Sequence, residues 1–353
     1  MSTRKALIAT IALLVVMLVV LLAMLPVLFP ENPGQLQTPT ITQPVPTPTP
    51  TTPTTPTIPT EPTSPVETPP ADTAPTDPPP TLPAELVFQS GTMLCDDFFV
   101  YDCSKDNMMA ISCSQQKKLY PASITKLFTA YVALQYLKPE DVITVGAALN
   151  MVGYGSSVAN LDWGHQLTVA QLIEGMLLPS GNDAAYVLAV AAARAQLGAE
   201  KNATDAAKHF VKLMNDHAKE LGMTGTNFCN PDGYHNDNHY TTPADLITIA
   251  KLALDTEIIR QCAGIAKDTV TFVSGETVEW ENTNYLLNPE SEFYCPEAIG
   301  LKTGKTNRSG YCLLSAFEVE GQFVVIGIFG GEKPDDRFID TVALFQAVKN
   351  SLG

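Results

Sequence analysis

A proline-rich segment, residues 30–83, divides this chain of 353 residues into two parts of different character. It holds 19 of the 28 prolines and is otherwise rich in threonine. Proline fixes the backbone φ angle and removes a hydrogen-bond donor, and so few apolar side chains cannot offset the entropy lost on folding. We therefore predict an extended linker without a fold, reaching on the order of 150 Å at about 3.1 Å per residue. Both a tether of useful length and a passive connection fit this composition.

An apolar run, residues 6–29, precedes the linker, and its only polar member is Thr10. A helix of roughly 20 residues crosses a hydrocarbon core, so the run is long enough to span a membrane. Arg4 and Lys5 precede it, and the positive-inside rule then keeps the N-terminus in the cytoplasm and sends the rest outside. A cleaved signal peptide is the alternative, but its apolar core is usually roughly 7–15 residues long and no Ala-x-Ala-like site follows. We predict a transmembrane signal anchor within residues 1–29.

Composition also restricts the partners and the cysteine chemistry of the part that follows the linker, residues 84–353. The net charge of −16, with no basic stripe, excludes nucleic acid as an expected partner. All seven cysteines lie here, and no CxxC pair is present to indicate a zinc cluster. Outside the cytoplasm disulfides can form, yet an odd number leaves at least one thiol unpaired. Cys312, in an apolar run, is expected to be a buried small hydrophobe.

Residues 84–353 show strand patterns at both ends and helical patterns in the middle. Two hairpins are predicted from β-prone runs on either side of turn residues, over 98–102 with 108–113 and over 310–319 with 322–329. Helical patterns cover residues 123–137, 168–178, 183–193, 204–221, 243–254 and 335–348. We predict an α+β fold in which both chain ends build one antiparallel sheet and a helical subdomain is inserted between them.

Three short polar elements carry candidate chemistry, and the first is Ser123-Ile-Thr-Lys126. If a helix begins here, Ser123 and Lys126 lie one turn apart on the same face. Serine needs a base within hydrogen-bond reach, which a lysine of lowered pKa supplies, and the Ser123 amide would face a developing oxyanion. Alone, the element favours an N-capping serine and a solvated lysine, since roughly one or two matches are expected by chance.

The second element, Ser180-Gly-Asn182, falls in a break between two apolar helices. A polar loop at such a place often lines a cleft, where a hydroxyl can relay a proton and an amide can hold a substrate carbonyl. Serine, glycine and asparagine are also ordinary turn and capping residues, which is the alternative interpretation.

The third element, Lys302-Thr303-Gly304, is predicted to end a short strand over residues 299–301 and is followed by Lys305. A strand edge offers backbone donors and acceptors to a peptide laid alongside it. Lys302 adds a positive charge, Thr303 adds a hydroxyl, and Gly304 lets a ligand approach the backbone. The alternative is an exposed turn at the end of a strand.

In this order, the three elements form the motif set of penicillin-binding proteins and class A β-lactamases. The sequence resembles the D-alanyl-D-alanine carboxypeptidase family of low-molecular-mass penicillin-binding proteins over about residues 93–350. The resemblance rests on Tyr120-Pro-Ala-Ser-Ile-Thr-Lys126, Leu178-Pro-Ser-Gly-Asn-Asp183, Asn230-Pro-Asp-Gly233, Tyr240-Thr-Thr-Pro-Ala-Asp245, Asn282-Thr-Asn-Tyr-Leu-Leu287 and Gly300-Leu-Lys-Thr-Gly-Lys-Thr306. It implies the penicillin-binding protein/serine β-lactamase-like fold and acyl transfer without a metal or an organic cofactor.

The resemblance implies catalytic roles for four residues. Ser123 would attack the penultimate D-Ala carbonyl of a peptidoglycan stem peptide ending in D-Ala-D-Ala, and Lys126 would be the base. Ser180 and Asn182 would relay a proton and position the substrate amide. The amides of Ser123 and Lys305 would form the oxyanion hole. β-Lactams are expected to acylate Ser123 as covalent inhibitors.

The resemblance also implies a substrate-binding set, which is Lys302, Thr303, Gly304, Lys305 and Arg337. Arg337 would bind the terminal carboxylate, although a capping or surface arginine fits the same acidic stretch. Lys305 departs from the family, where histidine, tyrosine or another bulky residue is more usual. On the family pattern a C-terminal β-domain and anchor would follow the last helix. We expect the chain to do without them and to be held at the cell membrane by residues 1–29, with the catalytic domain extracytoplasmic.

Other functions share parts of this pattern. A DD-endopeptidase would use the same site on cross-linked peptides. A β-lactamase of class A would need a Glu-x-x-Leu-Asn segment to activate water, and none lies between Asn182 and Lys302. A non-catalytic wall-binding module would not need Ser123, Lys126 and Lys302 together.

A metal-dependent peptidase is the last alternative, because His235 and His239 are four residues apart beside Asp232 and Asp237. The surrounding glycine, proline and asparagine residues predict a loop, and no glutamate separates the histidines. We expect loop histidines that contact the core or solvent.

Overall fold

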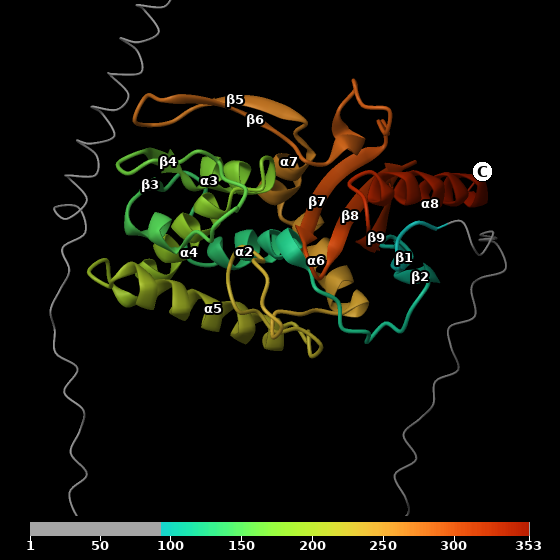
Figure 1. The fold of residues 1–353 in the computed structure, drawn as a ribbon, viewed down its shortest axis with the longest axis horizontal. Coiled ribbons are helices and arrows are strands. Elements are labelled where there is room, and N and C mark those ends of the chain that lie inside the picture. Colours follow the sequence, from blue (N-terminus) through green and yellow to red (C-terminus); the bar gives the residue numbers. More distant parts are fainter. Residues whose placement is uncertain (1–92, 353) are drawn as a thin grey trace, which may run out of the picture. The chain divides into compact units, whose positions relative to one another are not determined.

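The computed structural model describes residues 93–352, and its centre is a five-stranded antiparallel sheet (Figure 1). The strand order is β2-β1-β9-β8-β7, so strands from both ends of the described chain lie side by side. These strands are β1 (Asp97–Asp102), β2 (Asn107–Ile111), β7 (Ala298–Thr306), β8 (Gly310–Val319) and β9 (Gln322–Gly331). The predicted α+β fold is confirmed, whereas the predicted anchor and linker lie outside the described residues.

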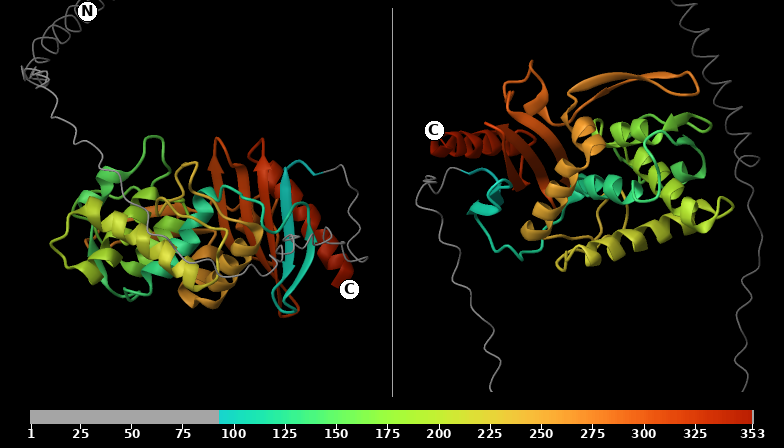
Figure 2. Two further views of the ribbon diagram at one scale, coloured as in Figure 1. Left: turned by 90° about the horizontal axis from the view of Figure 1, so that it is seen from below. Right: turned by 180° about the vertical axis from the view of Figure 1, so that it is seen from behind.

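The two faces of this sheet are covered by different helices, as the views in Figure 2 show. Helix α8 (Asp336–Leu352) packs on β8 and β9 from one side, and the helical subdomain lies on the other. Helix α2 (Thr125–Ala133) runs through the middle of that subdomain and is almost entirely buried. Its neighbours are α3 (Val169–Leu177), α4 (Asn182–Leu197), α5 (Ala203–Glu220), α6 (Pro243–Asp255) and α7 (Glu257–Gly264).

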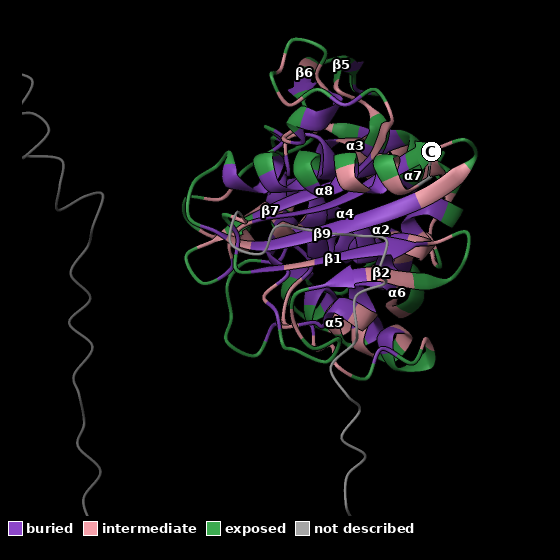
Figure 3. Cartoon of the chain, turned by 90° about the vertical axis from the view of Figure 1, so that its right-hand side faces the viewer, coloured by how far each residue is buried: buried purple, intermediate pink, exposed green. Residues whose placement is uncertain are grey.

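Alternation along the central strand β9 divides the core between these two sides. Val324, Ile326 and Ile328 pack with the side chains of α8. Val325 and Phe329 point the other way, into the core shared with the helical subdomain. This period of two is what a strand buried on both faces requires, and Figure 3 shows the sheet strands buried beneath the partly exposed α8.

Local capping explains where several helices begin. Thr168 and Gln171 form a capping box at the start of α3, in which each side chain accepts from the other residue's backbone amide. Asn202 accepts from the Asp205 amide at the start of α5. Thr242 caps α6, whose first residue is a proline, a residue well suited to that position.

The structure corrects one strand prediction at the third polar element. Lys302-Thr303-Gly304 does not end a strand, because β7 continues to Thr306, which pairs with Gly310 of β8. The length of β7 is therefore set by its partner strand, and Lys302 is buried in its middle.

Other elements were not predicted or differ in length. Helix α7 was not predicted from the sequence. Nor were two small two-stranded sheets, β3 (Val142–Thr144) with β4 (Gln166–Thr168) and β5 (Lys267–Thr271) with β6 (Thr277–Glu281). The helix predicted from residue 123 to residue 137 is a 3₁₀ turn, η1 (Ala122–Ile124), followed by the shorter α2.

All seven cysteines lie in the described part and carry free thiols. Cys312 is completely buried, as predicted. Within residues 93–352 no helix has both the length and the apolar character that a membrane span needs.

Trp280 joins the β5–β6 hairpin to the helical subdomain. Its Nε1 donates to the Ala159 carbonyl at 2.9 Å, and a Cβ on Gly175 of α3 would lie only 2.8 Å from its ring. We predict that Trp280→Phe lowers the free energy of unfolding by about 1–3 kcal/mol, because the buried Ala159 carbonyl loses its donor. Urea denaturation followed by circular dichroism measures this change. The control is Trp163→Phe, at a side chain that is 63% exposed, and it should change stability by less than about 0.5 kcal/mol. Equal effects of the two substitutions would contradict this account.

Candidate active site

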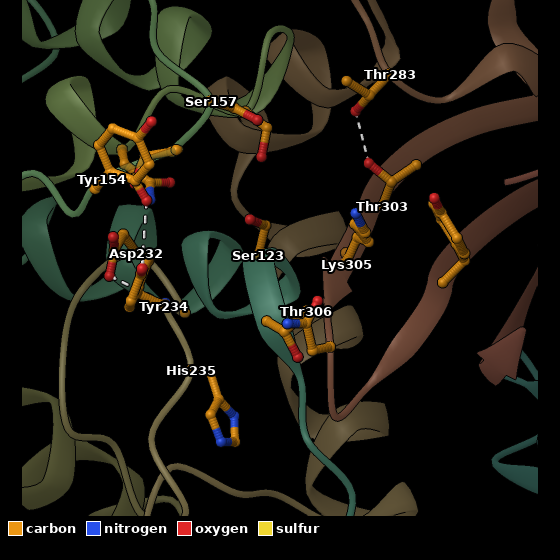
Figure 4. Close-up of a pocket in the computed structure, with 18 of the residues that line it drawn as sticks. Ser123, Tyr154, Ser157, Asp232, Tyr234, His235, Thr283, Thr303, Lys305 and Thr306 are labelled. Atoms are coloured by element: carbon orange, nitrogen blue, oxygen red, sulfur yellow. Dashed lines mark hydrogen bonds between the residues drawn. The ribbon is translucent and has the colours of Figure 1, made fainter. Parts of the chain in front are cut away.

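A cleft of about 650 Å³ lies beside β7, and the three predicted polar elements all reach it (Figure 4). Ser123 stands at its centre, in η1 immediately before α2. Thr303 and Lys305 of β7 border one side, and Asp232 and Tyr234 of a loop border the other. Segments far apart in the sequence therefore converge on one serine.

Lys126 is completely buried beneath Ser123. Its Nζ donates to the Ser123 Oγ at 2.8 Å, the Asn182 Oδ1 at 2.7 Å and the Asp232 main-chain oxygen at 2.7 Å. Burial lowers the pKa of Lys126 to about 8, although the negative charges of Asp232 and Asp183 oppose the shift. About one tenth of the Lys126 side chain is therefore neutral at pH 7. The neutral amine is the form that can accept a proton from Ser123.

The backbone on either side of Ser123 is fixed by close contacts. Ala122 has a φ angle of 47°, a value that non-glycine residues adopt at a cost. Gly233 lies so close that a Cβ there would be 1.8 Å from the Ala122 oxygen. A Cβ on Gly304 would meet the Sγ of Cys312 at 2.6 Å and the Pro121 oxygen at 2.9 Å. Gly304 thus lets β7 approach the serine turn, a packing role that the sequence did not indicate.

Residues 178–181 connect α3 to α4, and Ser180 and Asn182 line the cleft. Ser180 has a φ angle of 63° and is nearly buried at the cleft wall. The Asn182 side chain accepts from Lys126 and donates through Nδ2 to the Ser156 Oγ at 2.9 Å. The Asn182 backbone amide also donates to the Ser157 backbone carbonyl at 2.9 Å. These contacts hold the start of α4 and residues 156–157 together.

Lys302 is the second buried lysine of the site. Its Nζ donates to the hydroxyls of Thr283 and Thr303, each at 3.3 Å, and these two hydroxyls lie 2.6 Å apart. Burial lowers the pKa of Lys302 well below its ordinary value, and repulsion from Lys126 and Arg337 adds to the effect. The cluster presents hydroxyl groups backed by a positive charge to whatever enters the cleft.

Arg337 lies in the first turn of α8 and is nearly buried, so it is not a surface arginine. Its Nη1 donates to the carbonyls of Gly304 at 3.3 Å and Cys312 at 3.5 Å. Its Nε is buried without a hydrogen-bond partner among the described residues. The guanidinium lines the cleft near the Tyr311 ring.

Within residues 93–352, strand β7 is an edge strand of the sheet, since β8 is its one neighbour there. Its residues from Thr303 to Thr306 line the cleft, and the exposed Lys305 places its Nζ 5.4 Å from the centre of the Tyr311 ring. The open edge faces the same cleft as Ser123, which is the placement that pairing with an extended peptide requires.

The histidines considered as zinc ligands do not converge. The Cys229 amide donates to His239 Nδ1 at 3.1 Å, which leaves Nε2 to donate to Thr125 Oγ1 at 2.8 Å. His235 packs against Tyr120 at the surface and pairs with Asp237. In residues 93–352 no three His, Cys, Asp or Glu side chains are placed to hold a metal ion.

A model of the D-alanyl-D-alanine carboxypeptidase family matches residues 98–332 of the chain. The chain belongs to this family. It is 31% identical to D-alanyl-D-alanine carboxypeptidase DacF of Bacillus subtilis (strain 168), covering 64% of this chain and 54% of that protein. It is 35% identical to a D-alanyl-D-alanine carboxypeptidase of Streptomyces sp. (strain K15), covering 58% of this chain and 69% of that protein. The chain spans about half the length of most curated relatives that it matches.

Solved structures of related proteins have the same fold. The crystal structure of the Streptomyces K15 DD-transpeptidase superimposes with a TM-score of 0.65 at 29% identity, covering 72% of this chain and 97% of that one. Penicillin-binding protein D2 from Listeria monocytogenes, in its ampicillin-bound form, gives a TM-score of 0.58 at 25% identity, covering 72% and 98%. The resemblance to the D-alanyl-D-alanine carboxypeptidase family is thereby confirmed in both sequence and fold.

Among the polar residues of the cleft that were not predicted as site residues, three contact predicted ones. Thr283 and Asp232 lie within runs that carried the family resemblance, so their positions were marked although their contacts were not. Ser156 had no signal beyond its place in a glycine- and serine-rich loop. Each of them reaches the site through a partner distant in sequence.

His239 gives the site a predicted dependence of stability on pH. Burial lowers the pKa of His239 to about 4, and the positive charges of His235 and Lys126 add to this. The unfolded chain takes up a proton below about pH 6.5, whereas the folded chain does so only near 4. The stability from the buried neutral ring is therefore complete above pH 6.5 and is lost as pH falls toward 4, by up to about 3 kcal/mol.

We predict that His239→Gln removes this dependence, because glutamine has no charge to gain. The measurement is the free energy of urea unfolding between pH 4 and pH 7.5, compared with that of the unsubstituted chain. The control is His209→Gln, at a partly exposed histidine of α5. A His239→Gln curve parallel to that of the unsubstituted chain would contradict the assignment.

Proposed function

We propose that the chain is a serine D-alanyl-D-alanine carboxypeptidase that removes the terminal D-Ala from peptidoglycan stem peptides. The observation that carries this proposal is the 2.8 Å hydrogen bond from the buried Lys126 Nζ to the Ser123 Oγ, at the centre of an open cleft. A serine with its base in place is the requirement for acyl transfer. The family of the chain supports D-Ala-D-Ala peptides as the substrates.

In the first step, Lys126 accepts the Ser123 proton while Oγ attacks the carbonyl carbon of the penultimate D-Ala. The amides of Ser123 and Lys305 hold the resulting oxyanion. Ser180, held in the cleft wall beside Asn182, relays a proton to the departing amine, and D-Ala leaves. Water then attacks the Ser123 ester, which releases the shortened peptide and restores the serine.

The substrate would lie along β7 with its carboxylate toward the positive side chains. Lys302 and Arg337 are buried near that side of the cleft, and Thr303 supplies a hydroxyl between them and the serine. A free C-terminal carboxylate offers the complementary negative charge. The Asn182 side chain would hold the amide of the peptide on the opposite side.

A β-lactamase is less well supported. Among the described residues that line the cleft, Asp232 is the one carboxylic acid, and its side chain is buried beneath the surface. Fast hydrolysis of a β-lactam ester needs a carboxylate that can reach a water molecule. We therefore propose β-lactams as covalent inhibitors. An endopeptidase activity would use the same residues and is separated from carboxypeptidase activity by the choice of substrate.

The test of this function is D-Ala release by the purified protein from a peptide ending in Lys-D-Ala-D-Ala. We predict measurable release by the unsubstituted chain and none by Ser123→Ala, which has no nucleophile. A penicillin should add its own mass to the unsubstituted chain and not to this variant. Penicillin addition without D-Ala release would shift the assignment to an endopeptidase, for which a cross-linked dimer peptide is the substrate. If a folded chain neither reacts with penicillin nor releases D-Ala, the remaining assignment is a wall-binding module.

We further propose that residues 1–29 anchor the protein in the cell membrane, with residues 30–83 as the linker and the catalytic domain outside the cytoplasm. The uninterrupted apolar run with Arg4 and Lys5 before it supports this arrangement. A peptidoglycan substrate also places the enzyme on the outer side of the membrane. The positively charged N-terminus would then remain in the cytoplasm.

The intact mass of the protein recovered from cell membranes tests this anchor. We predict a chain that retains residues 1–29 and stays in the membrane fraction after a high-salt wash, because burial of the apolar run does not depend on charge. A chain that begins after residue 29 and is recovered in the medium would instead indicate a cleaved signal peptide.

A further inference from the structure

Asp232 has a buried carboxylate whose hydrogen bonding is incomplete. It lies in the loop between α5 and α6, at the wall of the cleft, and is 1% exposed. Its Oδ1 accepts from the Tyr234 amide at 3.2 Å. Its Oδ2 is buried and has no hydrogen-bond partner among the described residues. A carboxylate so placed costs stability, so packing alone does not account for it.

Lys126 is the cation whose charge acts on this carboxylate. The Lys126 Nζ donates to the main-chain oxygen of Asp232 at 2.7 Å, so the loop that carries the carboxylate also holds the amine. The two side chains form no direct ion pair within 4.0 Å, and each influences the other's proton affinity through its charge. Burial raises the pKa of Asp232, and the positive charge of Lys126 opposes this increase.

The other charged groups around Lys126 do not supply a carboxylate with an oxygen that lacks a hydrogen-bond donor. Asp183 accepts from the backbone amides of Ala159 at 2.8 Å and Leu161 at 3.1 Å, so both of its oxygens are engaged. Lys302 is a second cation, and its charge repels an ammonium on Lys126. His239 is held neutral by its two hydrogen bonds and low pKa.

The remaining titratable neighbour is Tyr186 of α4, whose phenol is affected by the charge of Asp232. Burial raises the pKa of its phenol, and the charge of Asp232 raises it further. Tyr186 therefore stays neutral and cannot neutralise a carboxylate. The Asp232 carboxylate therefore remains as the negative charge that can stabilise Lys126 when it becomes an ammonium.

We propose that Asp232 is a positioning residue for acylation: its carboxylate is the counter-charge that stabilises the ammonium formed when Lys126 takes the Ser123 proton. This inference rests on the proposed function. The Ser123 O–H bond breaks, a Lys126 N–H bond forms and the Oγ–carbonyl bond forms, which gives the oxyanion. The substrate C–N bond then breaks as its nitrogen takes a proton from Ser180, and Lys126 returns its extra proton to Ser180. Lys126 gains one positive charge in a site without bulk water, while Asp232 keeps its proton state and supplies the compensating field.

The test is the rate of acylation by a fluorescent penicillin as a function of pH, measured on the full chain and on Asp232→Asn. Asparagine preserves the size of the side chain and can still accept from the Tyr234 amide. Without the negative charge, Lys126 loses its proton more readily, so the acidic limb of the profile moves to lower pH. The maximal rate falls on the order of tenfold, because the ammonium of the transition state has lost its counter-charge.

The matched control is Asp237→Asn, which removes a carboxylate from the exposed part of the same loop. Its profile should superimpose on that of the unsubstituted chain. Asp232→Ser is a second neutral variant, and it must move the acidic limb in the same direction as asparagine. Thermal unfolding of each variant identifies any that are not folded, and the remaining neutral variant then carries the comparison.

A profile of either folded neutral variant that superimposes on that of the unsubstituted chain overturns the inference. So does a lower rate with an unmoved acidic limb, since a merely structural role would give that result. The proposed function fails separately, if the unsubstituted chain is no more acylated than Ser123→Ala. The inference and the function on which it rests are thus distinguished within one experiment.

Discussion

The arrangement of this site depends on excluding water from the Lys126 amine. Three acceptors surround its nitrogen, from Ser123, Asn182 and Asp232, and each belongs to a different segment of the chain. An amine with no access to water must find partners inside the protein. The same three bonds therefore bring the segments together, while the burial itself lowers the pKa of Lys126 to about 8. The contacts of Lys126 and its reactivity as a base therefore have one cause. Burial makes the three hydrogen bonds necessary, and it also lowers the affinity of the amine for its proton.

Close backbone packing is what allows these segments to approach. Ala122 takes an unfavourable φ angle, Gly233 lies against its oxygen, and Gly304 leaves room for Cys312. Any side chain larger than hydrogen at either glycine would push the 3₁₀ turn of Ser123 away from the loop or from β7. The cost of the strained backbone at Ala122 is offset by the large buried core of which α2 is the centre.

The local parts of this picture could be predicted from the sequence, and the parts set by distant contacts could not. The relation of Ser123 to Lys126 follows from helical spacing alone, and the strands at both chain ends follow from alternation and turn residues. The position of Lys302 inside a strand depends instead on where β8 begins and ends. The hairpin of β5 and β6 escaped detection because Val270 and Trp280 are its only buried residues. A pattern with one buried side chain per strand has no measurable period.

The electrostatics of the cleft oppose those of the whole chain. The net charge is −16, yet Lys126, Lys302 and Arg337 are all buried around one cavity. Lys302 repels both of the other cations, which raises the free energy of the empty site. On the proposed function, a substrate carboxylate near Lys302 and Arg337 relieves that repulsion. Part of the binding energy would then come from removing an unfavourable interaction within the protein, and a neutral C-terminus would not gain it.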